Sequence, residues 1–338
     1  MIRVESLTRR YGASTVVRDV SFTCEPGTVT GFLGPNGSGK STTLRMITGL
    51  TRPDAGQATV DGHPFAALPN ASRAVGTLLD ASATHRGRSG RAILRTAADM
   101  AGVPRRRVEE MLDLVGLAGP AAGRRSGTYS LGMRQRLGFA QALIGDPYVL
   151  ILDEPANGLD PEGIAWMRRL LREFAARGGT VLLSSHLLGE VQATVDRLVV
   201  IAAGAVVARG RLDELLAPAG LIVGAPDRAA LAAALSRAAI PFAPNPDGTL
   251  LVDVSSGTTA ADVARAAVGA GVLVTELRPA DHGTLEDLFF SLTASLPTDV
   301  PAGTVATGTR TGTGTRTGTG TGTAGSVAGS AARTEVAR

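Results

Sequence analysis

The chain has 338 residues, of which 44% are hydrophobic and 19% charged, so it can bury a full core and is not disordered throughout. Its 34 basic and 30 acidic residues leave a net charge of only +4, so we expect no nucleic-acid partner. The single cysteine, Cys24, excludes a disulfide framework and a cysteine-rich zinc site, and it favours a reducing compartment.

Extended segments dominate the first part of the chain. Strands are expected at residues 2–7, 15–24 and 28–33, which are rich in Val, Ser, Thr and Phe and are flanked by turn residues. The third of these runs into a glycine-rich turn at 34–39, and a helical pattern follows at 41–50. A further short strand is expected at 75–79.

Helical periodicity then appears, before strands and helices begin to alternate. Helices are expected at 91–117 and 131–145. The alternating part predicts strands at 148–152, 180–184 and 197–201, and helices at 161–177 and 187–195. This order predicts a parallel sheet covered on both faces. The longest apolar run, 198–208, is shorter than the roughly 20 residues of a membrane span, so we expect a soluble chain that needs a partner at any membrane.

The composition shifts toward alanine from about residue 218. The order of predicted elements resembles a split βαβ, or ferredoxin-like, unit. Its strands are expected at 220–224, 249–254 and 272–276, with a short further one between 241 and 248, and its helices at 227–239 and 259–269. A short amphipathic helix is expected at 285–292. Beyond it, Thr and Gly alternate in a low-complexity stretch that predicts a flexible tail.

The turn after the third strand has the pattern of a phosphate-binding loop. Residues 34–42 match G-x-x-x-x-G-K-[ST], in which glycines let backbone N–H groups curl around phosphates and a helix N-terminus faces the anion. Lys40 is the only lysine among the 34 basic residues, and a compact ammonium suits the terminal phosphates better than a planar guanidinium. The hydroxyl of Ser41 can bind Mg²⁺. The candidate phosphate contacts are Gly34, Pro35, Asn36, Gly37, Ser38, Gly39, Lys40, Ser41 and Thr42.

Two acidic residues follow the apolar strand at 148–152. A buried parallel strand delivers such residues to the carboxyl edge of the sheet, where ligands bind in open α/β folds. Asp153 is therefore a candidate Mg²⁺ ligand, and Glu154 a candidate general base for the attacking water. The alternative is that both acids cap the next helix, which Pro155 and the Asp160–Pro161 pair support.

With these two motifs, the chain resembles the ATP-binding subunit of ABC transporters over residues 1–217. Residues 129–136, Tyr-Ser-Leu-Gly-Met-Arg-Gln-Arg, are similar to the family's signature loop, and residues 158–160 to the loop that aligns two subunits. The resemblance implies an ABC-type P-loop NTPase fold, with a helical insert at about 82–145. It also implies that Ser130 and Gly132 contact the nucleotide of the opposite subunit, that Asp160 lies at the subunit boundary, that His186 contacts the γ-phosphate and that Tyr11 stacks on adenine.

The sequence departs from the family pattern at three positions. The signature has Leu131 where glycine is usual and Met133 where glutamine is usual. Asp80 occupies the position after the strand at 75–79 that usually holds glutamine. A carboxylate there can bind Mg²⁺ or the attacking water but cannot donate as an amide does, so Asp80 is a candidate catalytic and metal-binding residue, with His85 a weaker substitute.

The resemblance implies a dimer mechanism with ATP and Mg²⁺ as cofactors. Two copies head to tail would form two composite sites, and ATP binding and hydrolysis would close and open the pair. It implies a separately encoded transmembrane permease as partner, and a peripheral location on the cytoplasmic face of the membrane. The segment at 285–289, Leu-Glu-Asp-Leu-Phe, is similar to that of multidrug or daunorubicin-type exporters.

Three other functions remain open. One is a soluble ABC ATPase that acts on nucleic acid or ribosomes, and another is the ATPase of an importer. A stand-alone kinase or GTPase-like switch is the third, although it would lack the signature and His186. We expect an accessory α+β domain of ferredoxin-like type at 218–295 and a low-complexity tail at 296–338. The sequence offers no indication of the transported substrate.

Overall fold

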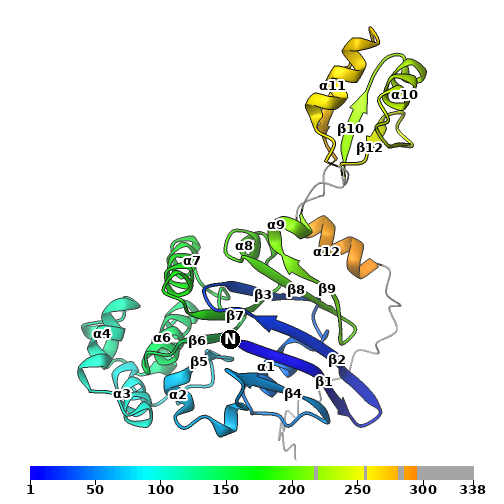
Figure 1. Cartoon of the computed structure of the whole chain (residues 1–338). Helices are drawn as coiled ribbons and strands as arrows, with labels where there is room; N and C mark the ends of the chain where they lie inside the picture. Colours follow the sequence, from blue (N-terminus) through cyan, green and yellow to red (C-terminus); the bar gives the residue numbers. More distant parts are fainter. Residues whose placement is uncertain (217–219, 255–256, 281–284, 295–338) are drawn as a thin grey trace, which may run out of the picture. The chain divides into compact units, whose positions relative to one another are not determined.

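The computed structural model describes residues 1–216, 220–254, 257–280 and 285–294 (Figure 1). The expected tail at 296–338 and the boundary at 217–218 lie outside these residues, so the predicted domain limits stay predictions.

A six-stranded sheet forms the centre of the first part, in the order β5-β6-β7-β3-β8-β9. Its strands from β5 to β8 pair in parallel, and β9 joins β8 as an antiparallel edge hairpin. The strands are β3 (Val29–Leu33), β5 (Val75–Leu78), β6 (Val149–Asp153), β7 (Thr180–Ser185), β8 (Arg197–Ala202) and β9 (Ala205–Arg211). The mainly parallel sheet expected from the alternating pattern is therefore present.

Both faces of this sheet are covered, as the continuous apolar strands predict. On β6, Val149 and Ile151 pack into one hydrophobic cluster, whereas Leu150 and Leu152 pack into another. The first cluster includes α1 (Lys40–Ile47) and an antiparallel sheet in the order β2-β1-β4. That sheet consists of β1 (Ile2–Tyr11), β2 (Ser14–Cys24) and β4 (Ala55–Val60).

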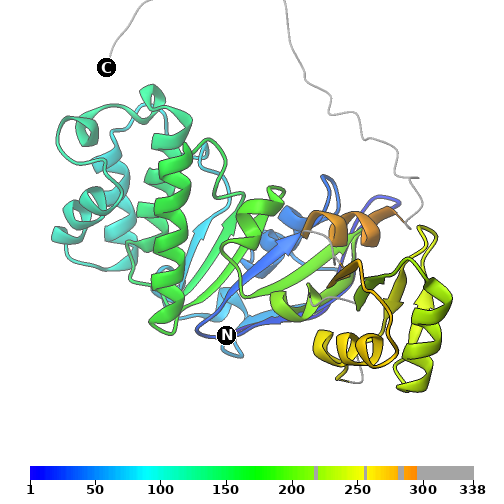
Figure 2. The same cartoon turned by 90° about the horizontal axis from the view of Figure 1, so that it is seen from above.

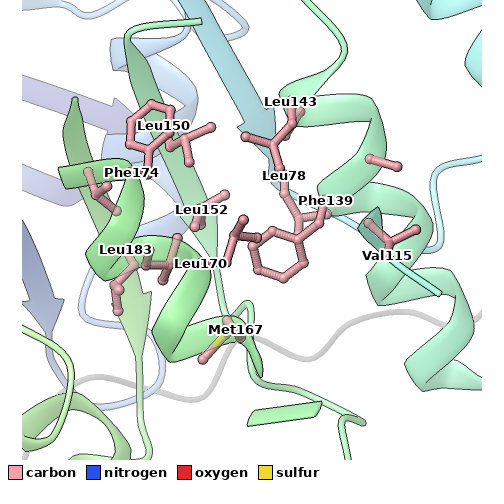
Figure 3. Packing of buried hydrophobic residues seen from close by; sticks show 14 of the residues in the cluster. Leu78, Val115, Phe139, Leu143, Leu150, Leu152, Met167, Leu170, Phe174 and Leu183 are labelled. Atoms are coloured by element: carbon pink, nitrogen blue, oxygen red, sulfur yellow. The ribbon is translucent and has the colours of Figure 1, made fainter. Parts of the chain in front are cut away.

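The second cluster joins the other face of the sheet to a group of helices. Figure 3 shows Phe139 between Leu78 of β5 and Met167 and Leu170 of α7, and Figure 2 shows the helical group beside the sheet. The Phe139 ring also meets the Trp166 ring edge-on, with centroids 5.4 Å apart. These helices are α3 (Gly90–Ala101), α4 (Arg106–Leu114), α5 (Pro120–Gly123), α6 (Leu131–Leu143), α7 (Pro161–Ala176), α8 (Leu188–Gln192) and α9 (Leu212–Leu215). The short helix α2 (Ala71–Ala74) belongs to the first cluster instead, through its buried Ala74.

Two details of the sequence prediction are wrong in this part. The single helix expected at 91–117 is two helices, α3 and α4. Gly102 ends α3 in the left-handed conformation, with φ 65°, and Pro104 follows two residues later, so the helix cannot continue. The expected helix at 187–195 is shorter, since α8 covers only Leu188–Gln192.

A four-stranded antiparallel sheet lies within residues 220–280, in the order β11-β12-β10-β13. With its two helices it has the strand order of a ferredoxin-like unit. The strand expected at 272–276 is wrong, because β13 begins where that range ends. The elements are β10 (Leu221–Gly224), α10 (Arg228–Arg237), β11 (Phe242–Pro244), β12 (Leu250–Val252), α11 (Ala260–Gly269) and β13 (Glu276–Pro279).

The amphipathic helix expected at 285–292 is present as α12 (Leu285–Ala294). It contacts α8, and its Leu285 is buried in the second cluster. Among the described residues, no helix is both long and apolar enough to cross a membrane.

Candidate nucleotide-binding site

The glycine-rich loop at 34–42 connects β3 to the N-terminus of α1. Gly37 and Gly39 have φ of 81° and 102°, a region that glycine enters without a Cβ clash. A Cβ on Gly39 would lie 2.6 Å from the carbonyl oxygen of Val16, and a Cβ on Gly34 would clash with the carbonyl oxygen of Ile201. Close approach of the backbone therefore requires glycine at both ends of the loop.

Lys40 folds its side chain back over this loop. Its Nζ donates hydrogen bonds to the carbonyl oxygens of Gly34, at 2.7 Å, and Pro35, at 3.1 Å. Burial lowers the pKa of Lys40, while the nearby carboxylates of Glu154 and Asp153 act in the opposite direction. The ammonium is thus held beside the loop and faces two acidic groups.

The acid pair lies at the carboxyl end of β6, beside the end of β7. Asp153 is paired in register with Ser184, whose Oγ donates a hydrogen bond to the Asp153 carboxylate. The same Ser184 Oγ accepts a hydrogen bond from the backbone N–H of Glu154, at 3.0 Å. Glu154 Oε2 lies 2.8 Å from Nδ1 of His186, which follows β7 directly. Glu154 and His186 were both predicted, and the structure brings them into contact.

Parallel pairing explains why these segments meet. β3 pairs with β7, and β7 with β6, so their carboxyl ends lie along one edge of the sheet. The loop at 34–42 leaves β3 there, Asp153 ends β6 with Glu154 directly after it, and His186 follows β7. Ligands bind at such edges in open α/β sheets.

The signature-like segment begins helix α6. Ser130 is the N-cap, and its Oγ accepts a hydrogen bond from the N–H of Met133 at 3.2 Å. Gly132 lies so close to residue 158 that an added Cβ would be 2.8 Å from the carbonyl oxygen of Gly158. Ser130 therefore caps α6 in this chain. Its side chain is also exposed, which leaves it accessible to a ligand.

Asp160 also acts as a cap in this chain. Its Oδ1 accepts a hydrogen bond from the N–H of Gly163, at 2.8 Å, at the start of α7. The carboxylate of Asp160 is thereby bonded to the start of the helix. The alternative that Asp153 and Glu154 cap this helix is wrong, since the observed cap is Asp160. Of the predicted acids, Asp160 caps the helix, whereas Asp153 and Glu154 bond to β7 and the histidine after it.

Asp80 and Tyr11 have other partners within their own segments. Asp80 Oδ1 accepts hydrogen bonds from Ser82 N and Oγ, at 2.7 and 2.6 Å, and these bonds lower the pKa of Asp80. The Tyr11 ring is 49% exposed, with the guanidinium carbon of Arg9 4.7 Å from its centroid. Nδ1 of His85 accepts a hydrogen bond from a backbone N–H two residues later, so it is bonded within its own turn.

Sequence reasoning missed two buried polar residues at this site. Ser184 is fully buried and bonds to both acids. Gln135 is only 3% exposed, and its Nε2 donates to the carbonyl oxygens of Glu154, at 3.2 Å, and Pro155, at 2.9 Å. Two features of the sequence could have identified them: a serine near the end of an apolar strand, and a glutamine inside a largely buried helix. Buried polar side chains of this kind need partners.

Comparison with known proteins places the chain in a family. The family described as ABC transporter matches residues 17–157. An ABC transporter ATP-binding protein of Bacillus subtilis is 34% identical over 300 residues, which cover 87% of this chain and 96% of that relative. The chain belongs to the ABC transporter ATP-binding family. This ABC ATPase binds and hydrolyses ATP, and its P-loop NTPase fold confirms the expected fold class.

Two further comparisons support the assignment. A bacitracin transport ATP-binding protein of Bacillus licheniformis is 37% identical to this ABC ATPase over 220 residues, which cover 64% of this chain and 71% of the relative. A solved structure of the ATP-binding subunit of an ABC transporter matches with a TM-score of 0.59 and 30% identity, and covers 64% of this chain and 91% of that chain.

Proposed function

We propose that this ABC ATPase drives a separately encoded transmembrane permease and that the pair exports drug-like or lipophilic compounds. Support for a transport function comes from the relative named as a bacitracin transport protein, and support for export from the C-terminal segment at 285–289, which is similar to that of multidrug exporters. The chain would lie peripherally on the cytoplasmic face of the membrane. The observation that carries the ATPase mechanism is the contact between Glu154 and His186 beside the phosphate-binding loop.

The loop and Lys40 bind the phosphates in this proposal. Residues 34–42 supply backbone N–H groups at a helix N-terminus, where anions are favoured. In the structure the ammonium donates to the carbonyl oxygens of Gly34 and Pro35. An incoming phosphate oxygen takes over these donor positions. The ammonium is therefore already in place before ATP binds.

The donor set fits Mg²⁺. Mg²⁺ prefers hard oxygen ligands and is commonly held by one or two carboxylates together with phosphates and water. Ser41 and Asp153 provide a hydroxyl and a carboxylate at the sheet edge, and Asp80 offers Oδ2, which takes no hydrogen bond from the described residues. When bound, the ion supplies Lewis-acid polarisation of the phosphate oxygens.

Glu154 takes the proton of the attacking water as general base. His186 orients this carboxylate through the 2.8 Å contact and presents its other ring nitrogen toward the γ-phosphate. Removing a base of this kind lowers the rate by roughly 10²- to 10⁴-fold. The Glu154→Gln variant keeps the shape of the side chain and removes its basicity.

The remaining candidates complete a composite site in a homodimer. Ser130 and Gly132, at the start of α6, contact the nucleotide held by the partner copy. Asp160 lies at the boundary between the copies while it caps α7, and the exposed ring of Tyr11 stacks on adenine after it leaves the Arg9 guanidinium. ATP then joins the two copies, and hydrolysis releases them.

The permease is the partner that tests this function most directly. Tagged Glu154→Gln protein would be purified from detergent-solubilised membranes of the native host with Mg-ATP, with Lys40→Ala protein as the nucleotide-binding control. We expect a polytopic membrane protein to co-purify with the first variant, and export of the compound to depend on both genes. Recovery of only soluble proteins or nucleic acid would contradict the transporter function.

A further inference from the structure

The backbone of Glu154 adopts a conformation that glutamate avoids. Its φ is 51°, in the left-handed region, which a side chain with a Cβ enters only at a cost in free energy. Such a residue keeps this conformation only when its surroundings hold it. The neighbours of Glu154 therefore decide where its carboxylate points.

Two buried side chains hold the residue from opposite ends of its backbone. Ser184 Oγ accepts the hydrogen bond from the Glu154 N–H, at 3.0 Å, and Gln135 Nε2 donates to the Glu154 carbonyl oxygen, at 3.2 Å. The same Nε2 donates to the carbonyl oxygen of Pro155, at 2.9 Å. These bonds fix the peptide groups on both sides of Glu154. With the backbone so held, the carboxylate meets His186.

Gln135 belongs to α6, the helix that begins with the signature-like segment. This helix touches the stretch after β6 at a second place, where Gly132 approaches the carbonyl oxygen of Gly158 too closely for any Cβ. Any shift of α6 relative to β6 must therefore alter the contacts that fix Glu154.

We propose that Gln135 is a positioning residue through which α6 controls the catalytic glutamate of its own chain. The inference rests on the proposed role of Glu154 as general base. Helix α6 would then have two roles. Its N-terminus contacts the nucleotide of the partner copy, as proposed above, and its Gln135 positions Glu154 within the same chain. When α6 is in the position seen here, Glu154 is oriented for proton transfer; when α6 moves away, the left-handed backbone loses its support.

The amide is what the position requires. One amide NH₂ group can donate to both carbonyl oxygens, whereas an ionised glutamate of the same shape has no donor and repels them. A protonated glutamate regains one O–H donor. The Gln135→Glu variant therefore makes the positioning bond depend on pH.

The first test compares steady-state ATPase rates of Gln135→Glu, Gln135→Ala and wild type between pH 6 and 9. We expect both variants to lose roughly 10- to 100-fold in kcat at pH 8 while KM for ATP changes less than threefold, because misplacing a catalytic group reduces the chemical step. The loss of kcat in Gln135→Glu becomes smaller as the pH falls, whereas the loss of kcat in Gln135→Ala is the same at every pH. Gln141→Glu, on the same helix, is the matched control and keeps the wild-type rate. A Gln135→Glu protein with wild-type kcat, or with a deficit equal at every pH, would overturn the proposal.

A second test asks whether Gln135 acts through Glu154. Single-turnover ATP cleavage is measured for Gln135→Ala in the wild-type and Glu154→Gln backgrounds. We expect the large loss in the first background and less than a twofold change in the second, because the residue that Gln135 positions is no longer a base. Equal losses in both backgrounds would show that Gln135 acts elsewhere and would overturn the coupling. A Glu154→Gln protein that cleaves ATP at the wild-type rate is a different failure: it would refute Glu154 as base, and the coupling with it.

Discussion

The single lysine of the chain provides the sharpest quantitative prediction. In Lys40→Met the unbranched side chain is kept as far as Cε but loses the ammonium that donates to Gly34 and Pro35. A hydrogen bond to a charged group contributes about 1.5–3 kcal/mol, and each 1.4 kcal/mol is a factor of ten in affinity. Because the free protein already satisfies this ammonium with two carbonyl oxygens, only part of the contact with phosphate is gained on binding. We therefore expect ATP to bind roughly 10- to 100-fold more weakly.

Isothermal titration calorimetry with Mg-ATP measures this loss. Arg45→Met is the matched control, since it removes a positive charge from the exposed face of the same helix and should leave the affinity within threefold of wild type. Thermal unfolding of both variants checks that they fold. A Lys40→Met protein that binds ATP within threefold of wild type would refute the assignment of this loop to the phosphates.

Three further predictions follow from the same structure. Ser184→Ala removes the hydroxyl that bonds Asp153 and should lower kcat at least tenfold with little change in thermal stability; a variant with wild-type kcat would contradict this. Phe139→Ala should cost about 3–5 kcal/mol in urea unfolding, and a loss below 1 kcal/mol would show that the ring is not packed as described. Ser82→Ala should raise the pKa of Asp80 in carboxyl NMR titrations, because the hydrogen bonds from Ser82 favour the charged carboxylate. These bonds stabilise the fold at a pH above the unfolded-state pKa of Asp80, and this stabilisation is lost as the pH falls through the folded-state pKa.

The parallel sheet and its phosphate loop were predictable because their signals are local. Apolar runs with polar ends mark β6 and β7, and the glycine pattern marks the loop. The β4 and β9 strands were missed. In β4, Gly56 lies at the register shift in the pairing with β1. The turn between β8 and β9 consists of Ala203, with φ 48°, and Gly204, whereas the sequence pair that indicates a hairpin is Asn-Gly. Neither strand carries a clean alternating pattern.

The contacts within the site depended on register, which the sequence does not display. Glu154 and His186 were both candidates, yet their contact exists because β6 and β7 are adjacent and parallel. The hydrogen bonds of Ser184 and Gln135 required the same tertiary information. Both residues looked like ordinary polar positions until their burial was known.

The mechanism proposed for this ABC ATPase requires two copies to enclose ATP, and the mass of the Glu154→Gln protein in solution tests that requirement most directly. Size-exclusion chromatography with light scattering would be run with and without Mg-ATP, at the same protein concentration. We expect a monomer without nucleotide and a stable dimer with Mg-ATP, and we expect the additional Lys40→Ala substitution to abolish the dimer. A Glu154→Gln protein that binds ATP and stays monomeric would contradict it.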